Sequence, residues 1–245
     1  MSLNKRFIST EPATTKYADA INLNGSDEYL DFNPNACNDN TLTISLWFRT
    51  TETSDRGFMV SQGTGGNNFA TVEIHQNGNL LVNSYDNATI MQLKTTATYN
   101  DGNWYHLVAA IDTGQTTSSN RVKMYVNGTQ ITAFDTATYP GYYEYLKFGS
   151  GDDITVGRLP NFSTGFFNGD LALIYYINGF QYAPTKFGQS SGGKWIPATY
   201  PNSYGTCGWF LNFSNASSLG TDSSGQSNNF GLNNITSANQ TEMAF

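Results

Sequence analysis

Apolar and polar residues alternate with a period of two in several short segments of the chain. The clearest are residues 42–48 (LTISLWF), 72–75 (VEIH), 122–126 (VKMYV) and 171–177 (LALIYYI). A period of two is typical of a β-strand that buries one face and exposes the other. We therefore predict strands at these positions, half-buried over residues 42–48, and a short helical turn over residues 183–188, which contain the proline of Tyr182-Ala-Pro.

Asn-Gly pairs punctuate these segments. Five occur, at 24–25, 77–78, 127–128, 168–169 and 178–179. Both residues tolerate the positive φ angles that a type I′ hairpin requires. The pairs at 77–78 and 127–128 follow alternating segments directly, which predicts hairpins there and antiparallel sheets.

Composition agrees with many strands joined by tight turns. Only 13% of the 245 residues are charged and 14% are aromatic, whereas long helices favour Ala, Glu, Lys and Leu. No second hydrophobic pattern marks a separate domain. We predict an all-β fold, a two-sheet antiparallel β-sandwich, over residues 19–245, preceded by a flexible or attachment arm over residues 1–18.

Charge and hydropathy exclude two kinds of partner. The formal net charge of −7 opposes nucleic-acid binding, which depends on cations that neutralise phosphates. The longest apolar run, residues 171–177, is too short to span a bilayer. The N-terminal residues carry no apolar segment of the kind found in secretory signals.

The two cysteines, Cys37 and Cys207, leave two interpretations open. They can form one disulfide, or they can be two small buried thiols, since a chain of this length does not need a covalent link.

Six segments occur in an order that is typical of a known family. They are 21–31 (INLNGSDEYLD), 42–48 (LTISLWF), 103–109 (NWYHLVA), 122–128 (VKMYVNG), 154–158 (ITVGR) and 167–172 (FNGDLA). Together they resemble the laminin-G-like branch of the concanavalin A-like lectin/glucanase sandwiches. The resemblance covers about residues 20–182 and implies a jelly-roll sandwich.

The C-terminal part narrows the resemblance. Segments 204–215 (YGTCGWFLNFSN) and 219–230 (LGTDSSGQSNNF) are similar to laminin-G-like structural proteins of tailed phages, many of them marine. This implies a virion component assembled in the host cytoplasm: a capsid decoration, a head or tail fibre, or an adhesin for host attachment. Its partners would be other capsid or tail proteins. We expect a homo-oligomer, and a trimer if the protein forms a fibre.

Residues 183–245 are expected to form a C-terminal extension that either completes the sandwich or docks on it or on a neighbour. The segment 209–213 (WFLNF) reads as a core strand, which favours completion.

Catalytic signals are absent from the sequence. Glucanases of this superfamily place paired carboxylates at alternate positions of one strand, about 5–10 Å apart, and no Glu-x-Asp-x-Glu string occurs. Glu28 and Asp31 are three residues apart, as are Glu52 and Asp55, so each pair points to opposite faces of a strand. His75 and His106 lack partners at metal spacing, and we expect His106 to be a hydrogen-bonded structural residue. The sequence therefore predicts a non-enzymatic protein.

Laminin-G-like relatives often hold one calcium ion, so the resemblance also implies a candidate metal site. Calcium prefers six to eight oxygen ligands. The candidate ligands are Asp152, Asp153, Asp170, Asp222 and Asn228. The alternative is that these residues only shape turns through local hydrogen bonds.

Four tyrosines, Tyr139, Tyr142, Tyr143 and Tyr145, cluster around Pro140-Gly141. They are the best local candidates for a contact with a host-surface glycan or with a neighbouring subunit. From the sequence we predict a virion structural protein; a carbohydrate-binding, lectin-like adhesin is the alternative, and a glycoside hydrolase is disfavoured.

Overall fold

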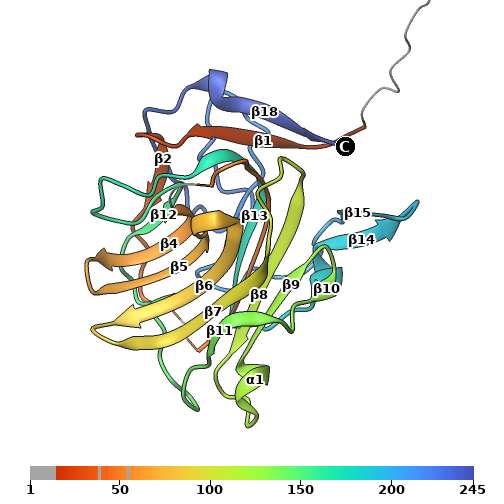
Figure 1. The fold of residues 1–245 in the computed structure, drawn as a ribbon. Coiled ribbons are helices and arrows are strands. Elements are labelled where there is room, and N and C mark those ends of the chain that lie inside the picture. The colour runs from red at the N-terminus through yellow and green to blue at the C-terminus, as the bar shows by residue number, and fades with distance from the viewer. Residues whose placement is uncertain (1–14, 38–39, 54–55) are drawn as a thin grey trace, which may run out of the picture.

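The computed structural model describes residues 15–37, 40–53 and 56–245, and it consists mainly of two stacked antiparallel sheets (Figure 1). Sheet A contains, in spatial order, β10 (Thr129–Gln130), β9 (Val122–Val126), β8 (Tyr105–Asp112), β3 (Thr41–Arg49), β13 (Asn168–Asn178), β1 (Lys16–Asn24) and β18 (Gln240–Ala244), with β16 (Trp209–Leu211) beside β13.

Sheet B contains, in spatial order, β11 (Phe134–Thr138), β7 (Thr89–Thr98), β6 (Asn79–Asp86), β5 (Asn68–Ile74), β4 (Gly57–Gly65), β12 (Ile154–Val156), β2 (Tyr29–Phe32) and β17 (Gly231–Asn233). A separate hairpin consists of β14 (Gly188–Ser191) and β15 (Lys194–Pro197). The described helices are α1 (Ser118–Arg121) and three 3-10 turns, Gln76–Gly78, Pro184–Lys186 and Ser237–Asn239. The predicted all-β sandwich is confirmed, and the predicted turn near residue 185 is one of the 3-10 turns.

The main core lies between the two sheets. It is formed by the apolar side chains that alternate along the strands, such as Ile44, Leu46 and Phe48 of β3 and Val72 and Ile74 of β5, all at most 1% exposed. Burying each such side chain stabilises the fold by about 1.5–3 kcal/mol.

Two of the five Asn-Gly pairs form the predicted hairpins. Asn77 and Gly78, with φ angles of 67° and 90°, join β5 to β6, and Asn127 and Gly128, with φ angles of 47° and 80°, join β9 to β10. The other three pairs lie where a strand begins or ends and join no hairpin.

The N-terminal boundary differs from the prediction. Strand β1 begins at Lys16 and pairs with β13 and β18, so residues 16–18 belong to sheet A and not to an arm. The rest of the predicted arm, residues 1–14, lies outside the described residues.

The prediction that residues 42–48 form a half-buried strand was wrong. Residues 42–48 of β3 are buried on both faces. The outward-facing Thr43, Ser45 and Trp47 are at most 1% exposed, because side chains of residues 180–204, together with Phe245, pack on the outer face of sheet A. Thr43 shows the contact: its hydroxyl donates to the carbonyl of Phe180 and accepts from the backbone N–H of Tyr182.

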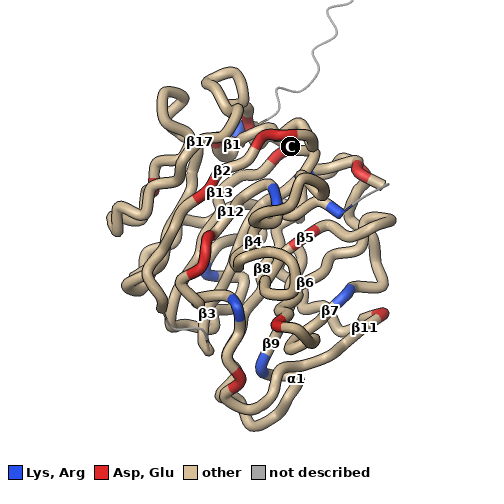
Figure 2. Tube along the Cα trace, turned by 90° about the vertical axis from the view of Figure 1, so that its left-hand side faces the viewer, with Lys and Arg blue, Asp and Glu red and all other residues tan. Residues whose placement is uncertain are grey.

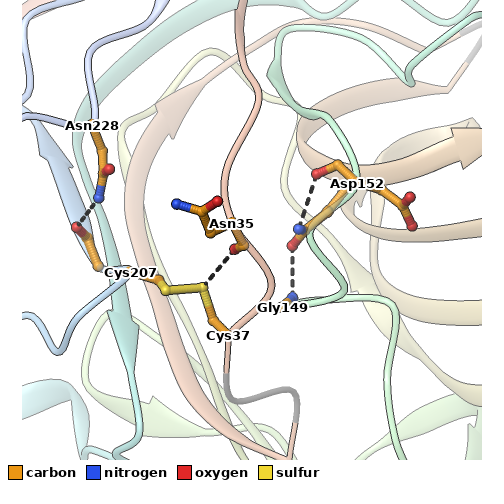
Figure 3. The surroundings of a disulfide bond; sticks show 8 residues. Asn35, Cys37, Gly149, Asp152, Cys207 and Asn228 are labelled. Atoms are coloured by element: carbon orange, nitrogen blue, oxygen red, sulfur yellow. Dashed lines mark hydrogen bonds between the residues drawn. A yellow bond between two sulfur atoms is a disulfide. The ribbon is translucent and has the colours of Figure 1, made fainter.

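The C-terminal extension both completes and covers the sandwich. Strands β16 and β18 pair with β13 and β1 in sheet A, and β17 pairs with β2 in sheet B. A disulfide joins Cys207 of the extension to Cys37, 170 residues away in sequence (Figure 3). Cys37 is held in turn by a backbone hydrogen bond to Gly149 of a loop beside sheet B. The extension is thus tied to both sheets.

Charged residues are sparse and spread along the described trace (Figure 2), with adjacent acidic pairs at Asp27-Glu28 and Asp152-Asp153. Among the described residues, no helix combines the length and apolar character needed to cross a membrane.

Candidate functional site

The outer face of sheet B carries a row of polar side chains. In β5, Ala70, Val72 and Ile74 point into the core, so Thr71 and its alternate neighbours point outward. Directly paired residues of neighbouring strands project on the same face. The pairings therefore align one polar residue from each of six strands, which we term the polar row: Asp31, Thr155, Ser61, Thr71, Asn83 and Gln92.

Part of this row has unused hydrogen-bonding capacity. Ser61 is fully buried and Asn83 is 6% exposed, yet Ser61 Oγ and Asn83 Oδ1 have no hydrogen-bond partner among the described residues. A buried polar atom without a partner costs about 1–3 kcal/mol. Such atoms are rare in native proteins and require an explanation.

An aromatic slot lies on the same face as the polar row, although none of the row's residues lines it. Phe69 and Tyr85, a registered pair on β5 and β6, stack with ring centroids 5.6 Å apart on one side of the row. Phe58 lies on the other side, paired with Glu73 of β5. Leu159 and Phe162, from the loop after β12, line the same space, which encloses about 270 Å³. We term this space the aromatic slot.

The slot has a neutralised cation at one end. Arg56 Nε and Nη2 donate to the two carboxylate oxygens of Glu73 at 2.8 and 2.7 Å, and Arg56 lies over the ring of Phe58 at 4.9 Å. Glu73 is fully buried. Burial raises the pKa of this carboxyl, and the hydrogen bonds from Arg56 oppose the rise. The pair leaves no net charge in the slot.

The carboxylates of this face are badly placed for glycoside hydrolysis. Asp31 and Glu73 both project outward, but three strand spacings separate β2 from β5, which is about 14 Å. Glycosidase carboxyls lie within about 10 Å of each other. Each of the two is also held by a donor, Asp31 by Asn233 Nδ2 at 3.0 Å and Glu73 by Arg56. The face is suited to binding, not to acid–base chemistry.

The predicted calcium ligands do not gather at one place. Asp152 accepts from Ser150 Oγ, Asp153 from Asn33 Nδ2, and Asp170 from Arg49. Figure 3 shows Asp152 and Asn228 on opposite sides of the disulfide.

Asp222 and Asn228 do meet. The backbone N–H of Asn228 donates to Asp222 Oδ2, and Asp222 also accepts from the backbone of Phe210 and Ser224. This is the turn-forming role that was the alternative for these residues. Among the described residues, no group of three or more His, Cys, Asp or Glu is arranged to hold a metal ion. Calcium binding stays a prediction.

The tyrosine cluster divides in two. Tyr142, Tyr143 and Tyr145 are 57–69% exposed, and Arg121 lies 5.8 Å from the ring of Tyr142. Tyr139 is partly buried and packs against the main core. Three rings of the predicted contact surface are therefore accessible.

Sequence reasoning did not single out Phe69, Tyr85 or Phe162. The period-two pattern places Phe69 and Tyr85 on one face of their strands, but their pairing depends on the register of β5 with β6. Phe162 reaches them from a loop more than 70 residues later in the sequence.

The molecule is thus defined as an antiparallel sandwich with a polar outer face, an aromatic slot and no catalytic carboxylate pair on that face. A family model described as the concanavalin A-like lectin/glucanases superfamily matches residues 24–178, more than half of the chain. The chain belongs to this superfamily, as the sequence resemblance implied. No curated protein matches it.

Solved structures share the fold at low sequence identity. A carbohydrate-binding protein from Bacteroides ovatus, described as putative, has a TM-score of 0.61 at 16% identity, over 94% of this chain and 61% of that one. A heptameric SAP-like pentraxin from Limulus polyphemus has a TM-score of 0.51 at 14% identity, over 68% and 78%. Domain 4 of a GH43 extracellular arabinanase from Geobacillus stearothermophilus, solved with arabinotriose, has a TM-score of 0.50 at 19% identity, over 66% and 72%.

Proposed function

We propose that this protein is a non-catalytic carbohydrate-binding protein, and that the aromatic slot on sheet B holds one ring of an uncharged sugar. The observation that carries the proposal is the stacked Phe69–Tyr85 pair beside the polar row. Sugar sites combine an aromatic surface for the apolar face of the ring with a few fixed polar groups for its hydroxyls.

Three features support an uncharged sugar. The slot volume of about 270 Å³ is below the range of drug-sized pockets, which suits a single ring. The Arg56–Glu73 pair cancels the charge at one end of the slot. Asn67, an uncharged polar residue, also lines the slot, where its side-chain amide suits a ligand hydroxyl.

Membership of a lectin and glucanase superfamily makes sugars the first ligands to test. Two of the similar structures involve carbohydrate: one is a putative carbohydrate-binding protein, and the other is an arabinanase domain in complex with arabinotriose. Arabinotriose is therefore a suitable probe.

The test is an immobilised-glycan array followed by calorimetric titration of the glycans that bind. Phe69→Ala and Tyr85→Ala should each weaken binding roughly tenfold or more, because each removes a stacking surface. Tyr142→Ala is the comparison variant, since it removes an equally large ring from the exposed tyrosine loop. A loss confined to Tyr142→Ala would move the site to that loop and contradict the slot.

A second pair of variants tests the slot without removing core atoms. Gly66 lines the slot at φ 59°, and a Cβ added there would meet no atom within 4 Å. Asn tolerates this backbone conformation, so Gly66→Asn should obstruct the slot and weaken glycan binding with little change in melting temperature. Gly225→Asn, at a glycine with φ 85° and equally open space, is the matched control. Equal affinity in both variants would count against the slot.

The virion role, the virion partners, the homo-oligomer and the assembly in a host cytoplasm stay predictions that rest on the sequence resemblance. The Cys37–Cys207 bond is of a kind that persists outside the reducing cytosol. Light scattering tests the oligomer, and a monomer at micromolar concentration would contradict it.

A further inference from the structure

A larger groove lies on the opposite side of the sandwich, against the outer face of sheet A. It is lined by residues of the turn that joins β9 to β10 and of the β14–β15 hairpin, and it encloses about 690 Å³. This is more than twice the volume of the aromatic slot. Its lining includes three aromatic side chains, Trp104, Trp195 and Phe245. Figure 1 shows the β14–β15 hairpin next to β9 and β10.

The groove is assembled from two parts of the chain. Trp104 and the Asn127-Gly128 turn lie inside the part that matches the superfamily, whereas Lys194, Trp195 and Phe245 lie outside it. The site therefore exists only where the C-terminal extension meets the sandwich, and the family fold alone does not contain it.

Trp195 attaches the β14–β15 hairpin to sheet A. Its indole Nε1 donates to His106 Nδ1 at 2.9 Å. A Cβ added at Gly128 or Gly188 would lie 2.6 or 2.5 Å from the indole ring, so the backbone of these two glycines lies directly against it. Strands β14 and β15 pair only with each other among the described strands. The Trp195 indole is therefore a principal contact between the hairpin and the sandwich.

His106, the hydrogen-bond partner of Trp195, is itself held in place by its neighbours. It is fully buried, its ring stacks on Trp47 at 4.8 Å, and Nε2 lies 2.8 Å from Ser45 Oγ. Because an indole N–H can only donate, Nδ1 accepts and the ring proton lies on Nε2, which donates to Ser45. The hairpin wall is thereby held in one orientation.

Two side-chain amides in the groove are oriented with one end free. Asn127 Oδ1 accepts the backbone N–H of His106 at 2.8 Å, which leaves its Nδ2 group to donate. Asn103 Nδ2 donates to Asp101 Oδ2 at 2.8 Å, which leaves its Oδ1 to accept. Such fixed planar groups suit the paired donor and acceptor positions of sugar hydroxyls.

Two further residues complete the lining. Trp104 is 9% exposed, and its indole N–H is buried without a hydrogen-bond partner among the described residues, so Trp104 offers the groove ring surface and not a donor. Lys194 is exposed and lies 5.8 Å from the ring of Phe245. It is the charged member of a lining that has no acidic side chain, in a chain with more acidic than basic residues.

We propose that this groove is a second carbohydrate site, which takes a segment of an oligosaccharide across Trp104, Asn127 and Lys194. The aromatic rings, the oriented amides and the volume of about 690 Å³ favour two or more linked sugar rings over one. Because the outer faces of two stacked sheets point in opposite directions, a protein with both sites bridges two glycans. The groove stands on its own residues; the bridging rests on the proposed function of the slot.

The test uses the full chain, the same glycan array with arabinotriose and sialyllactose among its probes, and titration of every glycan that binds. Asn127→Asp keeps the oxygen that accepts from His106 and removes the free Nδ2 donor. Lys194→Ala removes the ammonium. We expect each to weaken binding of the groove ligand roughly tenfold.

Matched controls exist for both variants. Asn87 is another turn asparagine, with φ 54°, so Asn87→Asp makes the same change elsewhere. Lys186 is another lysine of the extension that lies over an aromatic ring, 5.5 Å from Tyr182, so Lys186→Ala makes the same deletion away from the groove. Both controls should bind as the unaltered protein does.

The variants test the aromatic slot and the groove separately. Glycan binding that falls in Asn127→Asp and Lys194→Ala but survives in Phe69→Ala supports the groove. Binding that falls only in the slot variants overturns the groove and leaves the slot standing. Binding that falls only in the groove variants overturns the slot and leaves the groove standing. If the protein binds no glycan on the array, both sites are overturned.

The indole N–H signals provide an independent readout. In NMR spectra of the 15N-labelled protein, a groove ligand should shift the signals of Trp104 and Trp195 and leave Trp209, which is fully buried in the main core, unchanged. A bound glycan that shifts none of the tryptophan signals would contradict binding in the groove.

Discussion

The two outer faces of the sandwich begin from the same alternating pattern and end in different environments. On sheet A, Thr43 and Ser45 are buried and hydrogen-bonded, Thr43 to the extension and Ser45 to His106, although the indole N–H of Trp47 on the same face has no partner among the described residues. On sheet B, Ser61 and Asn83 are as deeply buried, but Ser61 Oγ and Asn83 Oδ1 lack partners within the described chain. The difference arises because residues 180–204 and Phe245 pack on the outer face of sheet A and not on that of sheet B.

This contrast separates the structural role of a face from its binding role. A covered face converts its polar and aromatic residues into core, with second and third apolar clusters around Tyr175 and Trp47. An uncovered face keeps hydrogen-bonding capacity and half-exposed rings, which is what a ligand site requires. On the sheet A side, the groove lies at the edge of the covering segment, and we expect ligand binding there.

The largest effect should come from removing the same side chain on each face. Tyr175 on sheet A is 4% exposed and contacts the rings of Phe187, Tyr200 and Phe210. Tyr175→Ala should lower the free energy of unfolding by about 3–5 kcal/mol, as for buried aromatic residues generally. Tyr85→Ala, at a half-exposed position, should cost about 1 kcal/mol or less.

Urea unfolding followed by circular dichroism measures both changes. Equal losses in the two variants would show that the outer face of sheet A is no better covered than that of sheet B. A small loss in Tyr175→Ala with intact glycan binding would remove the distinction altogether.

The disulfide should contribute the next largest effect. It fastens the covering segment through Cys207 to Cys37 across 170 residues. Replacing both cysteines by serine should lower the free energy of unfolding by about 2–4 kcal/mol, because the unfolded chain gains conformational freedom. Urea unfolding with and without reducing agent measures the change in the free energy of unfolding. The control is the double-serine variant, whose stability should not change with the reducing agent. A chain whose stability is insensitive to reduction would contradict the prediction.

Local signals explain why the architecture could be predicted and the cover could not. The hairpins at Asn77-Gly78 and Asn127-Gly128 follow from turn chemistry within two residues, and the alternation of residues 42–48 marks a strand. The same alternation says nothing about a second layer. Thr43 is buried by Phe180 and Tyr182, which are about 140 residues away, so its burial depends on how the extension docks.

The sites escaped prediction for the same reason. The slot requires the register of β4, β5 and β6 together with the loop that carries Phe162, and the groove requires Trp195 to meet Asn127. Trp104 is largely buried but also lines the groove. The tyrosines around Pro140 could be predicted as a cluster because they are close in sequence. Even so, Tyr139 packs against the core while the other three are exposed.

The effect that is absent at neutral pH and appears only in acid concerns His106, the buried residue that joins sheet A to the hairpin. Burial lowers the pKa of His106 to about 3 from its ordinary value of 6.5. Between these values the unfolded chain binds a proton that the folded chain does not, so stability should fall as pH falls from 6.5 toward 3. The slope is at most about 1.4 kcal/mol per pH unit for one group, and the carboxylates add their own terms.

Comparison with His106→Gln isolates this histidine, because the other titrating groups are common to both proteins. The stability difference between the parent and the variant, measured by urea unfolding, should be largest near pH 7 and should shrink steadily down to pH 4. The matched histidine is His75, which is partly buried at the end of β5, and His75→Gln should show a weaker change with pH, because burial lowers the pKa of His75 less. A parent-minus-His106→Gln difference that stays constant with pH would mean that water and protons reach the outer face of sheet A, and the cover inferred for that face would be wrong.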